Sequence, residues 1–200
     1  MSRGARARLF VALDAPASVR ERLAGWARSA VAGSEFGGAG RWLRLLDPGV
    51  LHLTLCFLGS RPVSEIAAIG SALSACPARM GELSVGAPLW LPRTHPRTLA
   101  VAIHDDEGDL TRLHAAVTQA ISAATDWEPT RRHFRAHVTV ARTRGRPPAA
   151  WNPAGEGSPL PATPQLRFTP ESVTLYRSWL SPGGATYEAV AARGLQPSAL

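Results

Sequence analysis

The chain has 200 residues, of which 45% are hydrophobic and 18% charged, so it can bury a core and does not have the composition of a disordered protein. Its net charge of +7 is carried entirely by 22 arginines, because the sequence contains no lysine. No apolar run approaches the roughly 18 residues that cross a bilayer, and the first apolar segment, 9–13, is too short for a signal peptide. We therefore expect a cytoplasmic protein and exclude the membrane and secreted classes.

The cysteines and motifs exclude several kinds of site. Cys56 and Cys76 are the only cysteines and form no CxxC, so neither a disulfide framework nor a zinc ribbon is expected. His133 and His137 lie four apart, but on a strand this spacing is about 13 Å, too far to share one ion. No P-loop or G-x-G-x-x-G follows a strand, which argues against ATP and dinucleotide binding. We expect no metal and no cofactor.

The first part of the chain reads as strand, helix, strand and helix. Residues 7–14 alternate in hydropathy and predict a strand. Apolar residues at helical spacing from Val19 to Ala30 predict an amphipathic helix. A second strand is expected over 50–58 and a second helix over 63–75.

The second part repeats this order, which indicates an internal duplication within one bilobal domain, 1–200. The segment 143–164 is rich in proline and reads as a surface loop. The other expected elements are strands over 83–91, 98–104 and 133–142, a helix over 107–124, and a final strand pair over 171–180 and 186–192.

Each of the two repeats carries His-x-Thr on a strand, as His52 with Thr54 and as His137 with Thr139. Side chains two apart on a strand share one face, so each motif presents one imidazole and one hydroxyl together. One such tetrapeptide is common by chance, whereas two in equivalent positions indicate a shared site. By the same alternation Cys56 falls on this face, but it lacks an activating partner and is expected to be a small core residue.

Two imidazoles with two hydroxyls suit metal-free cleavage of a phosphoester. One neutral imidazole takes a proton from water while one protonated imidazole gives a proton to the leaving oxygen, and histidine titrates near neutral pH. The threonine hydroxyls can donate to the phosphate oxygens, and an arginine would stabilise the developing charge. Six arginines surround the second motif, at positions 131, 132, 135, 142, 144 and 146, which favours a phosphate-rich ligand.

The paired HLTL and HVTV segments resemble the two-histidine (2H) phosphoesterase superfamily. The closer resemblance is to the bacterial and archaeal RNA 2′,3′-cyclic phosphodiesterases, once called 2′-5′ RNA ligases. The matching pieces cover nearly the whole chain in order: RLFVALD, RWL, LHLTLCFLG, HFRAHVTVAR and VTLYRSWLSPGGATYEAV. The resemblance implies a bilobal α+β fold, with two pseudo-twofold-related antiparallel sheets flanked by helices around an open central cleft. It also implies metal-independent hydrolysis of a terminal 2′,3′-cyclic phosphate to a 2′-phosphate.

The resemblance also assigns roles to particular residues. It makes His52 the proton donor to the leaving 3′ oxygen and His137 the proton acceptor. Thr54 and Thr139 would hold the phosphate, Arg142 occupies the family's arginine position, and Phe10 matches a first-strand aromatic near the cleft. The arginine cluster adds Arg135 and Arg132 as candidates for RNA contact, although Arg131 and Arg132 could equally be solvated. Ala136 departs from the proline that the family often has there, which should only loosen the entry to the strand.

Three functions remain open at this point. The first is hydrolysis of RNA ending in a 2′,3′-cyclic phosphate, with tRNA fragments among the possible substrates. The second is the same chemistry on a small nucleotide cyclic phosphate, and the third is a non-catalytic module that binds RNA ends. Ligation could be the reverse of the first reaction. We expect a monomer with no membrane contact and no obligate protein partner, in which Trp42 or Trp179 could stack on a base.

Overall fold

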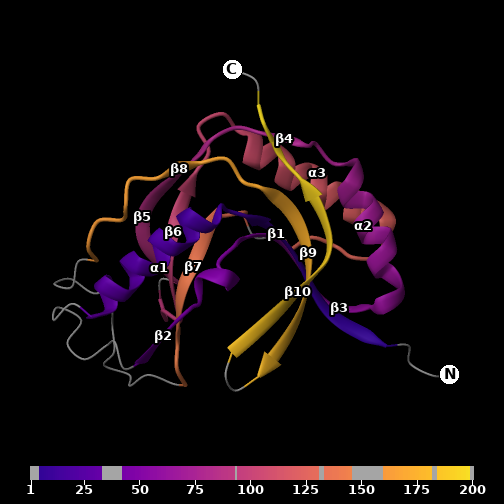
Figure 1. Cartoon of the computed structure of the whole chain (residues 1–200). Helices are drawn as coiled ribbons and strands as arrows, with labels where there is room; N and C mark the ends of the chain where they lie inside the picture. The colour runs from indigo at the N-terminus through magenta and orange to yellow at the C-terminus, as the bar shows by residue number, and fades with distance from the viewer. Residues whose placement is uncertain are drawn as a thin grey trace.

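The computed structural model describes residues 5–32, 42–92, 94–130, 133–145, 160–181 and 184–198 (Figure 1). Within these ranges the chain forms α-helices on one side of a nine-stranded sheet, and a separate two-stranded sheet. The helices are α1 (Ala17–Ala32), α2 (Ile66–Ala75) and α3 (Asp109–Ala124), with short 3₁₀ turns η3 (Pro48–Val50) and η4 (Val63–Glu65). The strands are β1 (Arg6–Asp14), β2 (Leu43–Leu45), β3 (Leu53–Pro62), β4 (Arg79–Met80), β5 (Leu83–Leu91), β6 (Thr98–His104), β7 (His137–Thr143), β8 (Arg167–Phe168), β9 (Ser172–Ser181), β10 (Gly184–Gly194) and β11 (Gln196–Pro197).

Every helix and strand expected from the sequence is present, but some ends differ. The second strand begins at Leu53 rather than at 50, because Pro48–Val50 forms a turn in which the Asp47 carboxylate accepts a hydrogen bond from the Gly49 amide at 2.7 Å. His52 therefore lies one residue before β3. The strand expected over 133–142 spans only His137–Thr143. The sequence did not predict β2, β4, β8 and β11, since two or three residues are too few to show a period. Residues 146–159 of the predicted proline-rich loop lie outside the described ranges.

The large sheet consists of two halves, of four and five strands, that meet at one point. Its strand order is β10-β9-β1-β3-β7-β6-β5-β8, and β2 also pairs with β7. At the junction, β3 and β7 share a single residue pair, Leu53 opposite Val138, in antiparallel orientation. The α+β class is thus confirmed, and the two predicted sheets are joined into one hydrogen-bonded sheet through this pair.

The two halves have matching topologies. β1, α1 and β3 in one half correspond to β6, α3 and β7 in the other, with β3 and β7 side by side at the centre. Each helix packs across the junction, since α1 contacts β7 and α3 contacts β3. The two halves therefore repeat one arrangement of strand, helix and strand.

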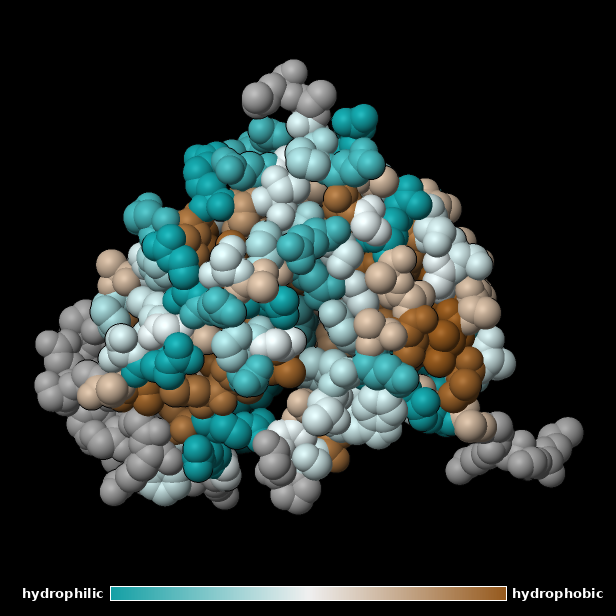
Figure 2. Space-filling model, viewed as in Figure 1, coloured by the Kyte–Doolittle hydropathy of each residue, from teal (hydrophilic) through white to brown (hydrophobic). Residues whose placement is uncertain are grey.

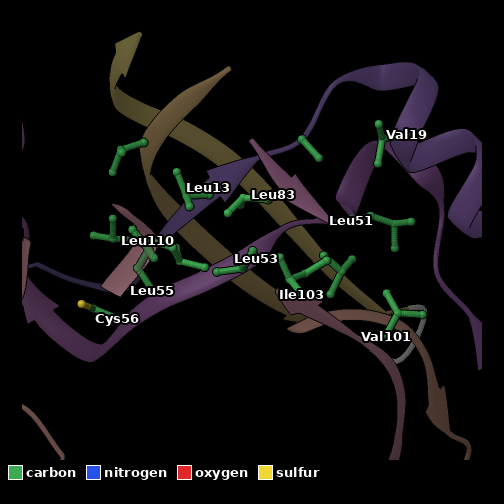
Figure 3. Packing of buried hydrophobic residues seen from close by; sticks show 14 of the residues in the cluster. Leu13, Val19, Leu51, Leu53, Leu55, Cys56, Leu83, Val101, Ile103 and Leu110 are labelled. Atoms are coloured by element: carbon green, nitrogen blue, oxygen red, sulfur yellow. The ribbon is translucent and has the colours of Figure 1, made fainter. Parts of the chain in front are cut away.

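One hydrophobic cluster lies between the helices and one face of the sheet (Figure 3). Apolar residues of α1, α2 and α3 pack in it against alternate residues of the strands, such as Leu13, Leu53 and Val101. The opposite face carries both His-x-Thr motifs and is called the histidine face below. The outer surface is largely polar in the view of Figure 2, where apolar atoms gather beside α2. Among the described residues, no helix has the length and apolar character needed to cross a bilayer.

Replacing the junction leucine should destabilise the protein strongly. Leu53 is only 3% exposed, so Leu53→Ala removes buried contacts and leaves a cavity, which we expect to lower the free energy of unfolding by about 2–5 kcal/mol. Leu180→Ala is the control, because Leu180 is 69% exposed and its loss should change stability by less than about 0.5 kcal/mol. Urea unfolding measures both, and equal effects would contradict this description of the core.

Candidate active site

The junction pair brings the two predicted motifs together. Leu53 and Val138 face each other and are both buried in the core, so their side chains point to the same side of the sheet. Their neighbours must then point to the other side, which places all four motif residues on the histidine face. Because the strands are antiparallel, His52 lies toward Thr139, and Thr54 lies toward His137. The sequence predicted this site from two tetrapeptides that lie far apart in the chain. The pairing of Leu53 with Val138 between β3 and β7 brings them together.

A β-bulge then brings a charged residue of β7 to the same face. Thr139 pairs with Ala100 of β6 and Ala141 pairs with Leu99, so Val140 is an extra residue of β7 without a partner in β6. Val140 and Ala141 are both buried in the core. Arg142, which pairs with Thr98, therefore lies on the same side of the sheet as Thr139. Simple alternation would have turned Arg142 toward the helices.

An equivalent bulge in β3 carries a different residue. Thr54 faces Ala12 of β1 and Cys56 faces Val11, so Leu55 is the extra residue. Phe57, five residues after His52, then faces Phe10 on the histidine face. Arg142 likewise lies five residues after His137. At equivalent positions, one half of the sheet therefore carries the aromatic ring of Phe57 and the other carries the cation of Arg142.

Each imidazole forms a hydrogen bond of the same kind, from its Nδ1 atom to the backbone carbonyl two residues earlier. Nδ1 of His52 lies 2.8 Å from the carbonyl oxygen of Val50, and Nδ1 of His137 lies 2.7 Å from that of Arg135. A carbonyl only accepts, so Nδ1 must be the donor in each ring. The exchangeable proton therefore belongs to Nε2 in both residues, which is the atom that can take or give a proton to a ligand.

An aromatic cluster surrounds His52, and the sequence predicted only part of it. The Phe10 ring centroid lies 4.8 Å from that of His52, and Tyr187 meets the imidazole edge-on at 5.3 Å. Tyr176 stacks on Phe10 at 5.2 Å. Phe10 is only 2% exposed, so its ring lies beneath the molecular surface and packs against the His52 ring. Tyr176 and Tyr187 come from β9 and β10, and their long sequence separation from His52 left no local signal.

Asp14 is a second residue that the sequence did not assign to the site. Its carboxylate accepts hydrogen bonds from the hydroxyls of Ser172, Thr174 and Tyr176, at 2.8, 2.6 and 2.8 Å. Burial, together with this carboxylate, raises the pKa of Tyr176 well above its ordinary value, so the phenol stays a donor. Asp14 is the last residue of β1 and lies two residues before Pro16, a pattern that is typical of the start of a helix rather than of a site residue.

The charge environment of His52 combines opposing effects. Burial is the largest and lowers the pKa of His52 below its ordinary value. The hydrogen bond to Val50 and the nearby Asp14 carboxylate raise the pKa, whereas Arg142 and His137 lower it. In the free protein the balance favours neutral His52 at neutral pH.

The other predicted ligand contacts are placed only in part. Arg135 is exposed at the entry to β7, where its carbonyl orients His137. Arg132 lies outside the described residues, as do Arg131 and Arg146. The described residues contain no group of three or more His, Cys, Asp or Glu side chains that could hold a metal ion.

Two expectations about other residues are wrong: the face on which Cys56 lies and the position of Trp179. The bulge in β3 turns Cys56 away from the histidine face and into the core, so its prediction as a small core residue is confirmed (Figure 3). Its sulfur lies 3.4 Å from the Thr118 hydroxyl. Trp179 lies on the opposite face of β9 from Tyr176 by alternation, and the Arg177 guanidinium covers its ring at 4.8 Å. His114 of α3 is half-buried and stacks on Phe134 at 4.1 Å. Trp42 remains a candidate for base stacking.

The thiol of Cys56 should be unreactive in the folded protein. Burial raises the pKa of Cys56 to about 11, so at pH 8 only about one thiol in a thousand is the reactive thiolate. We expect slow alkylation by iodoacetamide in the native protein and fast alkylation in guanidinium chloride, both followed by mass spectrometry. Rapid native labelling of Cys56 would revive it as a nucleophile.

Comparison with known proteins agrees with this geometry. No family model matches the chain. A curated protein of Archaeoglobus fulgidus, named RNA 2′,3′-cyclic phosphodiesterase, is 31% identical over 144 residues, covering 70% of this chain and 75% of that protein.

Two solved structures show the same fold. The crystal structure of Escherichia coli LigT complexed with 3′-AMP aligns at a TM-score of 0.74 with 22% identity, covering 96% of this chain and 99% of the other. The crystal structure of TT0787 of Thermus thermophilus aligns at 0.72 with 24% identity, covering 96% and 100%. Together with the curated relative and the paired motifs, they show that this chain is a phosphodiesterase of the RNA 2′,3′-cyclic phosphodiesterase family, within the 2H phosphoesterases.

Proposed function

We propose that the protein hydrolyses a 2′,3′-cyclic phosphate at the end of an RNA chain to a 2′-phosphate, without a metal ion. The observation that carries the proposal is the register at the junction, which sets two imidazoles and two hydroxyls on one face with both Nε2 atoms free to exchange protons. The relative's name supplies the substrate class, RNA with a cyclic phosphate.

In the proposed mechanism the two histidines divide the proton transfers. Nε2 of neutral His137 takes a proton from a water molecule as its oxygen attacks phosphorus. The bond from phosphorus to O3′ breaks, and Nε2 of protonated His52 donates its proton to that oxygen. The new phosphorus–oxygen bond comes from the water, so the product is a 2′-phosphomonoester with a free 3′ hydroxyl.

The remaining groups on the histidine face would bind the reacting phosphate. The hydroxyls of Thr54 and Thr139 can donate to its non-bridging oxygens, and the Arg142 guanidinium can stabilise the negative charge that develops there. Phe10 has the place of a supporting residue, since it is buried under the His52 ring. Arg135 and Arg132 remain proposed contacts to the RNA backbone.

The role of His52 as donor requires that it be protonated when substrate is bound. Burial lowers its pKa in the free protein, which opposes this role. An anionic phosphate between the histidines would raise that pKa again, as the Asp14 carboxylate already does. We infer that Asp14 is a positioning residue, which favours the protonated form of His52 without contacting the substrate.

The proposed reaction can be tested with a short RNA that ends in a 2′,3′-cyclic phosphate, in the presence of excess EDTA. We expect full turnover in EDTA and a product phosphate on O2′. His52→Ala and His137→Ala should each lower the rate by about 10²–10⁴-fold, because each removes one proton transfer. Phosphorus NMR of the product locates the phosphate.

Four outcomes would contradict parts of this proposal. Full activity in either histidine variant would exclude the acid–base pair, and loss of activity in EDTA would exclude metal independence. Binding of the RNA end without any turnover would indicate a binding module instead. Faster turnover of a nucleoside cyclic phosphate than of the RNA would favour a small substrate. Monomeric state and cytoplasmic location remain predictions from the sequence.

The proton-donor role of His52 predicts the effect of Asp14→Asn. Removing this carboxylate takes away an effect that raises the pKa of His52, so less His52 is protonated at pH 7.5, and kcat/KM there should fall several-fold. If His52 were the acceptor, it would already be neutral at this pH and kcat/KM would not change. Proton NMR titration of the imidazoles should show the lower pKa directly.

Glu188→Gln is the matched control for Asp14→Asn. Glu188 is exposed on β10, where it lies opposite Arg177, and by alternation it points away from the histidine face. Its substitution removes the same charge from the same half of the sheet, so kcat/KM at pH 7.5 should stay as in the unmodified protein. An equal fall in both variants would assign the effect to net charge rather than to Asp14.

A further inference from the structure

Two arginines lie directly opposite each other on the histidine face. The antiparallel pairing of β2 with β7 sets Arg44 against Arg142, with Leu43 and Leu45 as the flanking residues of β2. Leu43 is buried and Leu45 packs against the core, so Arg44 points to the other side of β2. This is the side to which the bulge in β7 turns Arg142.

Neither arginine of this pair forms an ion pair among the described residues. The ion pairs that the described ranges form involve Arg61, Arg112 and Arg167, whereas neither Arg44 nor Arg142 contacts a described carboxylate. Like charges directly opposite each other on neighbouring strands destabilise a sheet. Two adjacent guanidinium groups that form no ion pair among the described residues therefore indicate that this part of the face binds anions.

The guanidinium of Arg44 reaches the other half of the molecule. A Cβ atom placed on Gly184, the first residue of β10, would lie 2.8 Å from Nη1 and 3.1 Å from Cζ of Arg44. Gly184 has φ +131°, a conformation that other residues rarely adopt, so the backbone here can approach the arginine closely. Arg44 thus lies between β2 and the β9–β10 hairpin, and is half-buried there.

Arg44 and Arg142 are level with each other on neighbouring strands, but their guanidinium groups lie near different parts of the molecule. Arg142 acts on His52 from this position, since its charge contributes to the lowered pKa of that residue. The Arg44 guanidinium, by contrast, packs against the hairpin backbone at Gly184.

We propose that Arg44 binds a second phosphate, the one on the 5′ side of the terminal nucleotide, while Arg142 binds the reacting phosphate. The proposal rests on the proposed function, which places the cyclic phosphate between the histidines. The planar guanidinium can make two parallel hydrogen bonds to phosphate oxygens, and such a contact strengthens binding more than a neutral one. Arg44 would therefore make the protein prefer a chain, or a 5′-phosphorylated nucleotide, over a nucleoside cyclic phosphate.

The test compares two ligands that differ by one phosphate. Adenosine 2′-monophosphate carries the phosphate of the expected product, and adenosine 2′,5′-bisphosphate adds a phosphate at the 5′ position. Isothermal titration calorimetry should show that the bisphosphate binds the unmodified protein about ten- to hundredfold more tightly. In Arg44→Gln this advantage should shrink to a few-fold, while affinity for the monophosphate is retained, which also shows that the variant is folded.

Arg112→Gln provides the matched control. Arg112 is an exposed cation of α3 that pairs with Asp109, on the helical side of the sheet, so its loss lowers the net charge equally. It should leave the advantage of the bisphosphate unchanged. An equal loss in both variants would assign the effect to net charge and overturn the role of Arg44.

The outcomes separate this inference from the proposed function. If the unmodified protein binds both ligands equally, or if Arg44→Gln weakens both ligands equally, Arg44 does not bind a second phosphate, whatever the turnover assay shows. If the bisphosphate advantage depends on Arg44 but the cyclic phosphate is not hydrolysed, the second phosphate site stands and the proposed reaction is wrong.

Discussion

The active-site geometry depends on a single backbone pairing, Leu53 opposite Val138. Both side chains are buried, so the hydrophobic core fixes the rotation of β3 and β7 about their own axes as well as their register. A slip of one residue would turn one motif toward the helices, because side chains alternate between the faces of a strand. Burial of two apolar residues thus positions four polar residues, none of which contributes to the core.

The two bulges let one scaffold support unequal chemistry. Each follows its motif threonine and turns the fifth residue after the histidine to the histidine face, as Phe57 in one half and Arg142 in the other. Around His52 this gives an aromatic, buried environment, whereas the half that carries His137 places a cation, Arg142, on the same face. A reaction that needs one acid and one base gains from this asymmetry, since equivalent surroundings would give the two imidazoles similar proton affinities.

Much of the fold and part of the site follow from the sequence. Hydropathy periods located the helices and the long strands, and the repeated His-x-Thr pattern identified the two histidines and threonines. Cys56 was assigned to the wrong face because a bulge is invisible to a period-two count, and the same bulge geometry is what brings Arg142 to the site. Asp14 and Tyr176 were missed because their roles depend on a strand more than 150 residues away from Asp14.

The count of 22 arginines without a lysine indicated a protein that binds anions, and the sequence concentrated six of them near the second motif. The local sequence pattern could determine the charge and its clustering because charge and hydropathy are properties of the residues themselves. Only the tertiary structure decided which arginines stand together, by pairing β2 with β7 and setting Arg44 opposite Arg142 next to the hairpin of the other half. Strand pairing joins residues about a hundred positions apart, and no local pattern encodes which partner a strand will find.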